Sequence, residues 1–209
     1  MAQTARQRLS HGERRAQLLR CAVTDAAKVG LGRLTHAGVA RESGVAVPTV
    51  FAYFGNRTAL VEATVEDVKR FYLELAAYWH RPEVPARAAI EGHIRAYYDS
   101  IHSELDYAQV WLEWCTAVRN EFGIWSSFLD YYERIVELLA SSVRRGQKQG
   151  TIGKSVNAVD AARQLVSCGV TVTQLYFMQR DKREITRYIN CTLRLVLGDE
   201  PVRDAGGQA

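Results

Sequence analysis

The chain has few of the residues that interrupt regular structure, with four prolines and fifteen glycines among its 209 residues. Two of the prolines, Pro82 and Pro85, lie close together, which leaves long stretches without any proline. Because an all-β fold needs many tight turns, this scarcity favours long helices. Long apolar runs are also missing. No stretch of about 18 apolar residues occurs, so we expect no membrane span and no membrane partner.

Paired cysteine motifs are absent as well. The four cysteines, Cys21, Cys115, Cys168 and Cys191, form no C-x-x-C pair, and each lies among apolar residues. This pattern predicts reduced, buried thiols in a cytoplasmic protein. The first ten residues are polar and contain no apolar core, so they do not have the form of a signal peptide.

The common catalytic motifs are missing too. The sequence has no H-E-x-x-H, no G-x-S-x-G and no phosphate-binding loop, and we therefore expect neither an enzyme nor a cofactor. His93, His102 and Cys115 are chemically able to bind a metal, but nothing in their spacing selects them. The sequence thus predicts no metal site.

The charge is small overall and unevenly distributed. The net charge is +4, yet residues 1–57 contain nine Arg and Lys against three acids. The rest of the chain is slightly acidic. A basic N-terminal part on a slightly acidic body favours a polyanionic partner at one end, although solvated basic faces are common.

Helix signals begin near the N-terminus. The run from Ser10 to Glu13 has the form of a capping box, in which the serine and glutamate side chains satisfy each other's backbone N–H groups. Apolar residues then recur at helical spacing up to Val29, and Gly30 can end the helix in a left-handed cap. We predict a first helix over residues 11–29.

Two short helices and a tight turn follow. Thr35 can cap the second helix, and Gly44 supplies the positive φ that a sharp turn needs. Pro48 fits the first turn of a third helix, which we expect to stop at Gly55. Asn56 can then cap a fourth helix that runs to about residue 79. Two short helices joined at a glycine predict a helix-turn-helix over residues 35–54.

The rest of the chain also has helical periodicity. We expect further helices near residues 84–104, 106–121, 124–149, 157–180 and 183–198. The predicted fold is all-α, with about nine helices: an N-terminal three-helix head with the helix-turn-helix, and a larger body for ligand binding and dimerisation. We divide the chain into an N-terminal arm and DNA-binding domain (1–55), a regulatory and dimerisation domain (56–200) and a flexible tail (201–209).

The run from Gly44 to Leu60 resembles the signature of the TetR family of bacterial regulators, a G-V-x-x-x-T-hydrophobic-aromatic-x-aromatic-F/V-x-x-K/R-x-x-L string. The chain is also similar to the quorum-sensing branch of that family, which includes HapR, SmcR and LitR. That similarity continues downstream in Val110–Trp114 and Arg119–Glu121. Relatives in the branch tend to carry Asn where this chain has Ala52, so we expect a different operator.

The resemblance implies that the third helix lies in the major groove of double-stranded DNA. The chemistry of individual side chains suggests which part of the DNA each would contact. Thr49 and Tyr53 carry hydroxyls for phosphates or base edges, and Arg57 adds its charge to the N-terminus of the fourth helix. Arg6 and Arg8 precede the first helix on an arm that could enter a minor groove.

Apolar positions of the third helix complete the predicted DNA-binding set. Ala52 offers only a methyl-sized contact, suited to the methyl group of thymine. Val50 and Phe54 are better explained as core residues. The remaining predicted DNA-contacting residues are Thr35, Val47, Pro48 and Phe51.

The resemblance further implies a ligand cavity in the body and a homodimer formed through the last two helices. A small apolar or aromatic ligand is the expected occupant, although aromatics at helical spacing are more often core than cavity. Glu113, between two tryptophans, is expected to be a buried acid with a cationic partner such as Arg119, or a polar anchor for the ligand. The expected pocket residues are Phe71, Tyr72, Leu75, Tyr97, Ile101, Trp111, Trp114, Phe128, Tyr132 and Val170.

One alternative function fits the same helices. A helical protein-interaction module that never touches DNA would share the periodicity and the basic N-terminal part. It would lack the steep loss of DNA affinity with salt that counterion release produces.

Overall fold

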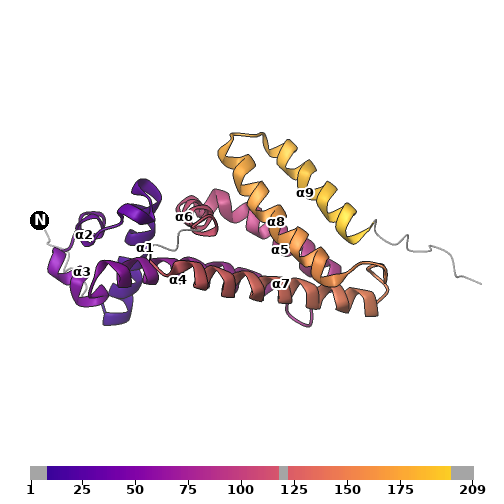
Figure 1. Cartoon of the computed structure of the whole chain (residues 1–209), viewed down its shortest axis with the longest axis horizontal. Coiled ribbons are helices and arrows are strands. Elements are labelled where there is room, and N and C mark those ends of the chain that lie inside the picture. Colours follow the sequence, from indigo (N-terminus) through magenta and orange to yellow (C-terminus); the bar gives the residue numbers. More distant parts are fainter. Residues whose placement is uncertain (1–8, 118–121, 199–209) are drawn as a thin grey trace, which may run out of the picture. The chain divides into compact units, whose positions relative to one another are not determined.

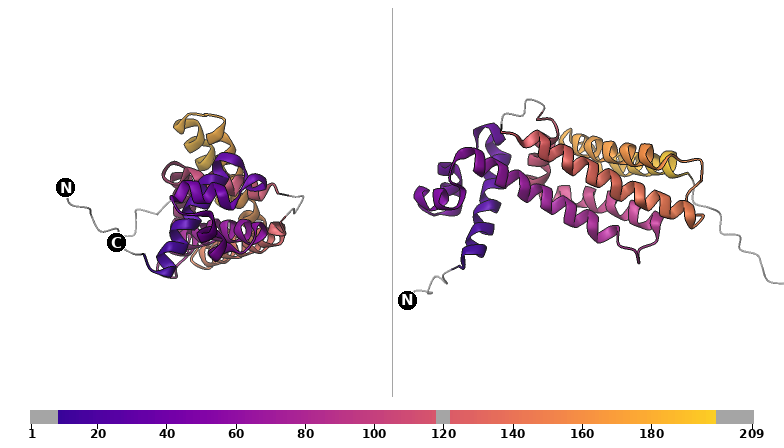
Figure 2. Two further views of the ribbon diagram at one scale, coloured as in Figure 1. Left: turned by 90° about the vertical axis from the view of Figure 1, so that its left-hand side faces the viewer. Right: turned by 60° about the horizontal axis from the view of Figure 1, so that its bottom comes forward.

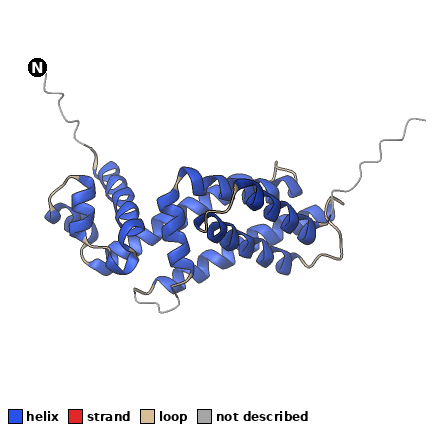
Figure 3. Cartoon of the chain, turned by 90° about the horizontal axis from the view of Figure 1, so that it is seen from above, coloured by secondary structure: helices blue, strands red, loops and turns tan. Residues whose placement is uncertain are grey.

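The computed structural model describes residues 9–117 and 122–198, and all regular structure in these two stretches is helical (Figure 3). Nine α-helices and one short 3-10 helix follow one another there without a strand. The predicted all-α class is therefore confirmed. Within these stretches, no helix is both long and apolar enough to cross a membrane.

The chain packs as two compact units. The first, called the head unit, contains the described residues up to Lys69 together with Asp106–Ser127. The second, called the body unit, contains Arg70–Leu105 and the described residues from Phe128 onward.

Two long helices contribute to both units. They are α4 (Arg57–Trp79) and α7 (Ile124–Lys148). The sequence predicts a domain boundary between residues 55 and 56, from the position of the helix-turn-helix motif. That boundary stays a prediction. Packing adds the first half of α4 and nearly all of α6 (Leu105–Cys115) to the head unit.

Helix α1 (His11–Val29) begins at the predicted capping box. The Glu13 N–H donates to Ser10 Oγ over 3.3 Å, and the Ser10 N–H donates to the Glu13 carboxylate over 2.8 Å. Hydrogen bonds from the Ser10 side chain and the Ser10 backbone N–H to the Glu13 carboxylate lower the pKa of Glu13. At the other end Gly30 has the expected positive φ of 87°, but its ψ of 150° is extended. The predicted left-handed cap is therefore wrong, because the chain leads directly into the 3-10 helix η1 (Leu31–Arg33).

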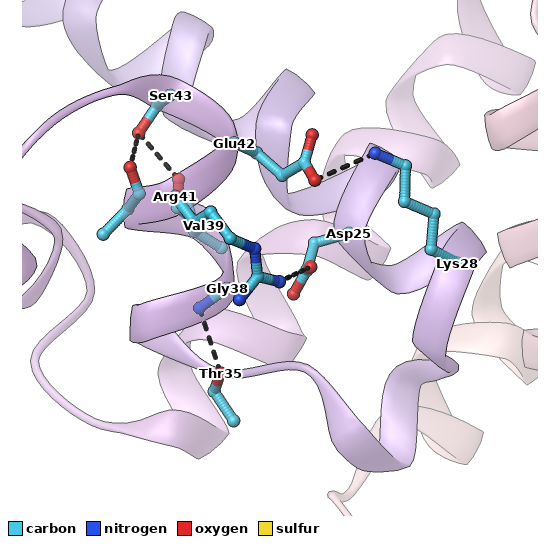
Figure 4. Close-up of polar contacts among 9 residues, drawn as sticks. Asp25, Lys28, Thr35, Gly38, Val39, Arg41, Glu42 and Ser43 are labelled. Atoms are coloured by element: carbon cyan, nitrogen blue, oxygen red, sulfur yellow. Dashed lines mark hydrogen bonds and ion pairs between the residues drawn. The ribbon is translucent and has the colours of Figure 1, made fainter.

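The predicted turn joins α2 (His36–Ser43) to α3 (Val47–Phe54). Thr35 Oγ1 accepts the Gly38 N–H over 3.1 Å and so caps α2, as its position predicts (Figure 4). Gly44 ends α2 with φ 66° and ψ 31°, which is the left-handed conformation that the turn was expected to need.

A buried carboxylate joins α1 to α2. Asp25 is 2% exposed, and its Oδ1 lies 3.2 Å from a guanidinium nitrogen of Arg41 (Figure 4). A Cβ at Gly38 would lie 2.0 Å from Asp25 Oδ2, so the close approach of these helices requires glycine there. On the surface, Lys28 Nζ pairs with the Glu42 carboxylate at 2.8 Å.

The body unit contains α5 (Ala86–Ser103), α8 (Ala158–Phe177) and α9 (Lys182–Leu197), with the remaining parts of α4 and α7. Helices α8 and α9 lie side by side and antiparallel (Figures 1 and 2). The predicted apolar stripe of α9 faces the unit's interior, and its buried members are Ile185, Ile189, Leu193 and Leu197.

The body unit contains a polar cluster in which His93 and Ser142 are buried and His80 is half-buried. His80 Nδ1 lies 2.7 Å from Ser142 Oγ, and His80 Nε2 lies 3.0 Å from His93 Nδ1. Burial is the main reason that the pKa of both imidazoles lies well below its ordinary value, with Arg145 adding to the effect at His80. Both rings therefore stay neutral near pH 7. No cluster of His, Cys, Asp and Glu suited to a metal ion occurs among residues 9–117 and 122–198.

Two sequence-based expectations are corrected here. Helix α6 ends at Cys115 instead of reaching residue 121, because Thr116 and Ala117 bond to carbonyls three residues back and tighten the last turn. Residues 118–121 lie outside the described stretches. Among the cysteines, Cys168 is buried but Cys191 is exposed, since it lies on the face of α9 opposite the apolar stripe.

Candidate nucleic-acid interface

Helix α3 has two faces of opposite character. Val50 and Phe54 are 0% and 3% exposed and belong to the core of the head unit, as the sequence predicts. On the other face Phe51 is 47% exposed and Val47 is 37% exposed. The predicted contacts Pro48 and Ala52 are exposed on this face too. We call Val47, Pro48, Phe51 and Ala52 the α3 outer face.

His36 supports α3 from α2, and sequence reasoning missed it. Its ring stacks on Phe51 with a centroid distance of 3.8 Å and an interplanar angle of 2°. Its Nε2 lies 2.9 Å from the Phe54 carbonyl oxygen, which can only accept, so this nitrogen donates. One buried side chain thereby fixes both the orientation of Phe51 and the C-terminal end of α3.

The predicted hydroxyl donors have different surroundings. Tyr53 is half-buried, and its ring stacks on His11 at the start of α1 with a centroid distance of 4.6 Å. Thr49 is half-buried in the first turn of α3. Thr35 is exposed, but its hydroxyl already accepts a hydrogen bond in the cap of α2. The predicted arm residues Arg6 and Arg8 lie outside the described residues.

Arg57 is held by the head unit itself. Its Nε donates to the Leu34 carbonyl over 3.0 Å, and an Nη donates to the Gly32 carbonyl. The centre of its guanidinium lies 4.8 Å from the centre of the Phe122 ring. The sequence predicts a phosphate contact here. The observed contacts add a structural role, because this side chain joins the start of α4 to the chain before α2.

Helix α6 is bonded to the head at both ends. Thr24 Oγ1 of α1 donates to the Asp106 carboxylate over 2.6 Å. The Glu113 carboxylate accepts the Leu31 N–H through both oxygens, at 2.9 and 3.0 Å. Glu113 is exposed, so the expectation of a buried acid is wrong. Its two oxygens instead satisfy a backbone donor at the start of η1, 82 residues away along the chain.

The predicted pocket residues divide between the two units. Trp111 and Trp114 belong to the head unit, where the Trp114 indole N–H donates to the Ile124 carbonyl over 2.9 Å. The others belong to the body unit. In the body unit Phe71, Leu75, Phe128, Tyr132 and Val170 are half-buried, whereas Tyr72, Tyr97 and Ile101 are buried.

The interior of the body unit is hydrogen-bonded as well as aromatic. Tyr97 and Tyr72 have a centroid distance of 5.3 Å. Thr173 donates to the Gly169 carbonyl over 3.0 Å, so the Tyr97 hydroxyl, 2.7 Å from Thr173 Oγ1, donates to that oxygen. A Cβ at Gly169 would lie 3.5 Å from the Tyr97 ring, so α5 and α8 pack closely at this point. A ligand role for these residues stays a prediction.

The helix-turn-helix region matches a known family. Residues 18–64 match the model described as bacterial regulatory proteins, tetR family. The protein "HTH-type transcriptional regulator LuxR" of Vibrio harveyi is 31% identical over 129 residues. That alignment covers 62% of this chain and 62% of LuxR, so it spans less than two thirds of the relative's length. The helix-turn-helix part of the chain, residues 18–64, is thus a domain of the tetR family.

Solved structures of TetR proteins share the fold. A TetR-like transcriptional regulator from Rhodococcus sp. RHA1 has a TM-score of 0.73 at 17% identity, covering 90% of this chain and 96% of that one. The regulator FadR of Bacillus subtilis, solved with stearoyl-CoA, has a TM-score of 0.71 at 16% identity, covering 88% and 99%. The chain therefore has the fold of these transcriptional regulators.

Proposed function

We propose that this chain is a transcriptional regulator of the TetR family and not an enzyme, and that it binds double-stranded DNA through the α3 outer face. The observation that supports the proposal most directly is the division of α3 into a buried face and an exposed face. Phe51 and Val47 are large, apolar and exposed, which costs solvation free energy unless a partner covers them. Ala52 and Pro48 lie on the same face and are small enough to let the helix approach the edges of bases.

We propose further that the active form is a homodimer through α8 and α9. The apolar stripe of α9 is already buried within the chain, so a dimer would use the outer surfaces of the two helices. Leu195 is 81% exposed and Met178 is 61% exposed on this part of the body unit. A twofold dimer presents two α3 helices to successive major grooves about 34 Å apart, which implies a near-palindromic operator.

Regulation by a ligand is the third part of the proposal. The relationship to TetR proteins, with FadR solved in complex with stearoyl-CoA, supports a small apolar or aromatic effector in the body unit. Such an effector acts by binding one arrangement of the heads better than another. The similarity to LuxR and to the quorum-sensing branch extends the proposal to control by cell density in the cytoplasm.

The decisive experiment is selection of random duplex DNA by the purified full-length protein, followed by affinity measurements against salt. We expect enrichment of a near-palindrome and a steep fall in affinity with salt through counterion release. Ala52→Glu, which adds a negative charge to the α3 outer face, should abolish the enrichment. Ala88→Glu makes the same change on the exposed side of α5 and should preserve it.

The opposite result would favour the interaction module. A folded, dimeric protein that enriches no sequence, both alone and with cell extract added as a source of effector, would contradict DNA binding. Equal behaviour of the two glutamate variants would contradict the assignment of α3 as the recognition helix.

A further inference from the structure

A pocket of about 400 Å³ lies in the body unit where α8 turns into α9. The aromatic side chains that line it come from α5 and α8, and two cations come from the turn and the start of α9. None of these residues belongs to the predicted ligand cavity. We call the site the turn pocket, and its principal residues are Tyr98, His102, Tyr176, Phe177, Arg180 and Lys182.

The four rings of the turn pocket form a continuous edge-to-face series. Tyr98 and His102 have a centroid distance of 5.0 Å at 86°, and His102 and Tyr176 have one of 4.9 Å at 77°. Tyr176 and Phe177 follow at 5.6 Å and 86°. The His102 ring is further oriented by its Nδ1, which lies 3.3 Å from the Tyr98 carbonyl oxygen. This arrangement offers flat apolar surfaces against which a planar ring can stack.

The charged side of the turn pocket is positive. Arg180 and Lys182 are exposed, and neither forms an ion pair with any residue that the structure describes. Asp181 lies between them, but its carboxylate accepts the N–H groups of Arg183 and Glu184 as the N-cap of α9. The acid between them in the sequence is thus engaged in capping the helix, and the two cations remain available to a ligand.

We propose that the turn pocket binds a planar aromatic compound that carries an anionic group, such as a carboxylate or a phosphate. The rings stack against the ligand's ring, while Arg180 and Lys182 form charge-assisted hydrogen bonds with the anion. Aromatic rings alone would also suit a quaternary ammonium ion, but two cations at the same site oppose it. The volume of about 400 Å³ is within the range of small-molecule sites. This proposal does not rest on the proposed DNA binding.

Salicylate is a suitable probe, because it combines one ring with one carboxylate, and its matched neutral analogue is 2-hydroxybenzyl alcohol. We expect salicylate to bind the full-length protein with a Kd on the order of 0.1–1 mM, as a compound of this size allows. The alcohol and choline should bind at least about tenfold more weakly, since they cannot form the ionic hydrogen bonds. Ligand-observed NMR titration measures all three.

Substitutions inside and outside the turn pocket test where salicylate binds. Arg180→Gln combined with Lys182→Gln should weaken salicylate binding at least about tenfold without changing the weak binding of the alcohol. Arg183→Gln combined with Arg187→Gln removes the same charge from the part of α9 outside the turn pocket, and should change the Kd less than about twofold. Phe177→Ser should weaken both aromatic probes. Circular dichroism and thermal melting verify that each variant is folded.

Three results would overturn the proposal. The first is an absence of saturable salicylate binding up to several millimolar. The second is the same salicylate affinity in the two double variants. An equal loss of affinity in both would mean general attraction to a positive surface, and no loss in either would place salicylate elsewhere. The third is salicylate affinity that follows protomer association in sedimentation experiments, which would mean that a second copy of the chain covers the pocket.

Discussion

The Arg57 side chain donates to the Leu34 carbonyl over 3.0 Å while its guanidinium stacks at 4.8 Å on the ring of Phe122. These contacts connect the first turn of α4 to the segment before α2 and to the segment before α7, all within the head unit. The residue that the sequence predicts as a phosphate contact therefore also maintains the geometry of the helix-turn-helix.

Replacement of Arg57 by alanine tests both roles. We expect the free energy of unfolding to fall by about 1–2 kcal/mol, because two backbone carbonyls lose a charged donor. DNA affinity should weaken for all sequences, and the slope of log affinity against log salt should flatten by about one unit. Denaturant titration and binding isotherms at several salt concentrations measure these changes. Arg20→Ala, on the exposed side of α1, is the control for loss of charge alone.

An unchanged unfolding free energy would contradict the structural role of Arg57. An unchanged salt slope would instead remove Arg57 from the phosphate contacts, and the loss of affinity would then be due to the altered head. The two measurements thus separate the roles.

Ala52 determines part of the base preference in our proposal. Ala52→Asn adds an amide that can bond bidentately to adenine, so we expect one position of each half-site to gain a preference for adenine of about 1–3 kcal/mol. Stability should hardly change, because the position is exposed. Repeating the DNA selection with the variant measures the shift. An identical selected motif would mean that residue 52 does not face the bases, and Ala88→Asn on α5 provides the matched control.

Gly92 lies in the middle of α5, where alanine would ordinarily favour the helix by about 1 kcal/mol. Here a Cβ would lie 2.2 Å from Cε3 of Trp79 and 2.3 Å from its Cζ3. Because a bulky ring must move, we expect Gly92→Ala to lower the free energy of unfolding by about 1–3 kcal/mol. Gly12→Ala is the control, since nothing lies within 4 Å of its Cβ, and it should be neutral or stabilising. Equal stabilisation by both changes would contradict the packing of Trp79.

The pair of half-buried His80 and buried His93 should make stability depend on pH. Burial lowers the pKa of His80 to about 4, and that of His93 is also lowered. Both residues titrate near 6.5 in an unfolded chain. Protons therefore bind the unfolded state more tightly. The contribution of the pair to the free energy of unfolding is complete above about pH 6.5. It declines as the pH falls toward 4, by up to about 1.4 kcal/mol per pH unit for each histidine.

Denaturant titrations between pH 7.5 and 4.5 measure this decline. His93→Gln keeps a hydrogen-bonding side chain but removes one titrating group, and should make the decline shallower. His102→Gln, at an exposed position, is the control and should leave it unchanged. A decline of equal steepness in His93→Gln would show that other groups cause it.

Local chemistry made much of the head predictable from the sequence. The capping box at Ser10, the Thr35 cap and the turn at Gly44 each depend on residues within four positions of one another, so sequence spacing is enough to identify them. The two faces of α3 follow from helical periodicity in the same way. Gly30 shows the limit of this reasoning. The backbone conformation at the end of a helix depends on the segment that follows, which here is the 3-10 helix η1.

Tertiary packing decided what lies far apart in the sequence. No pattern indicates that Glu113 accepts the Leu31 N–H from 82 residues away, or that Asp25 lies so close to Gly38 that only glycine fits. The stacking of His36 on Phe51 depends on the angle between two helices, which periodicity does not encode. The sequence by itself determined the helices, most of their caps and the helix-turn-helix that matches the tetR family. Only the tertiary structure determined which side chains meet, because contacts between helices depend on interhelical distances and angles.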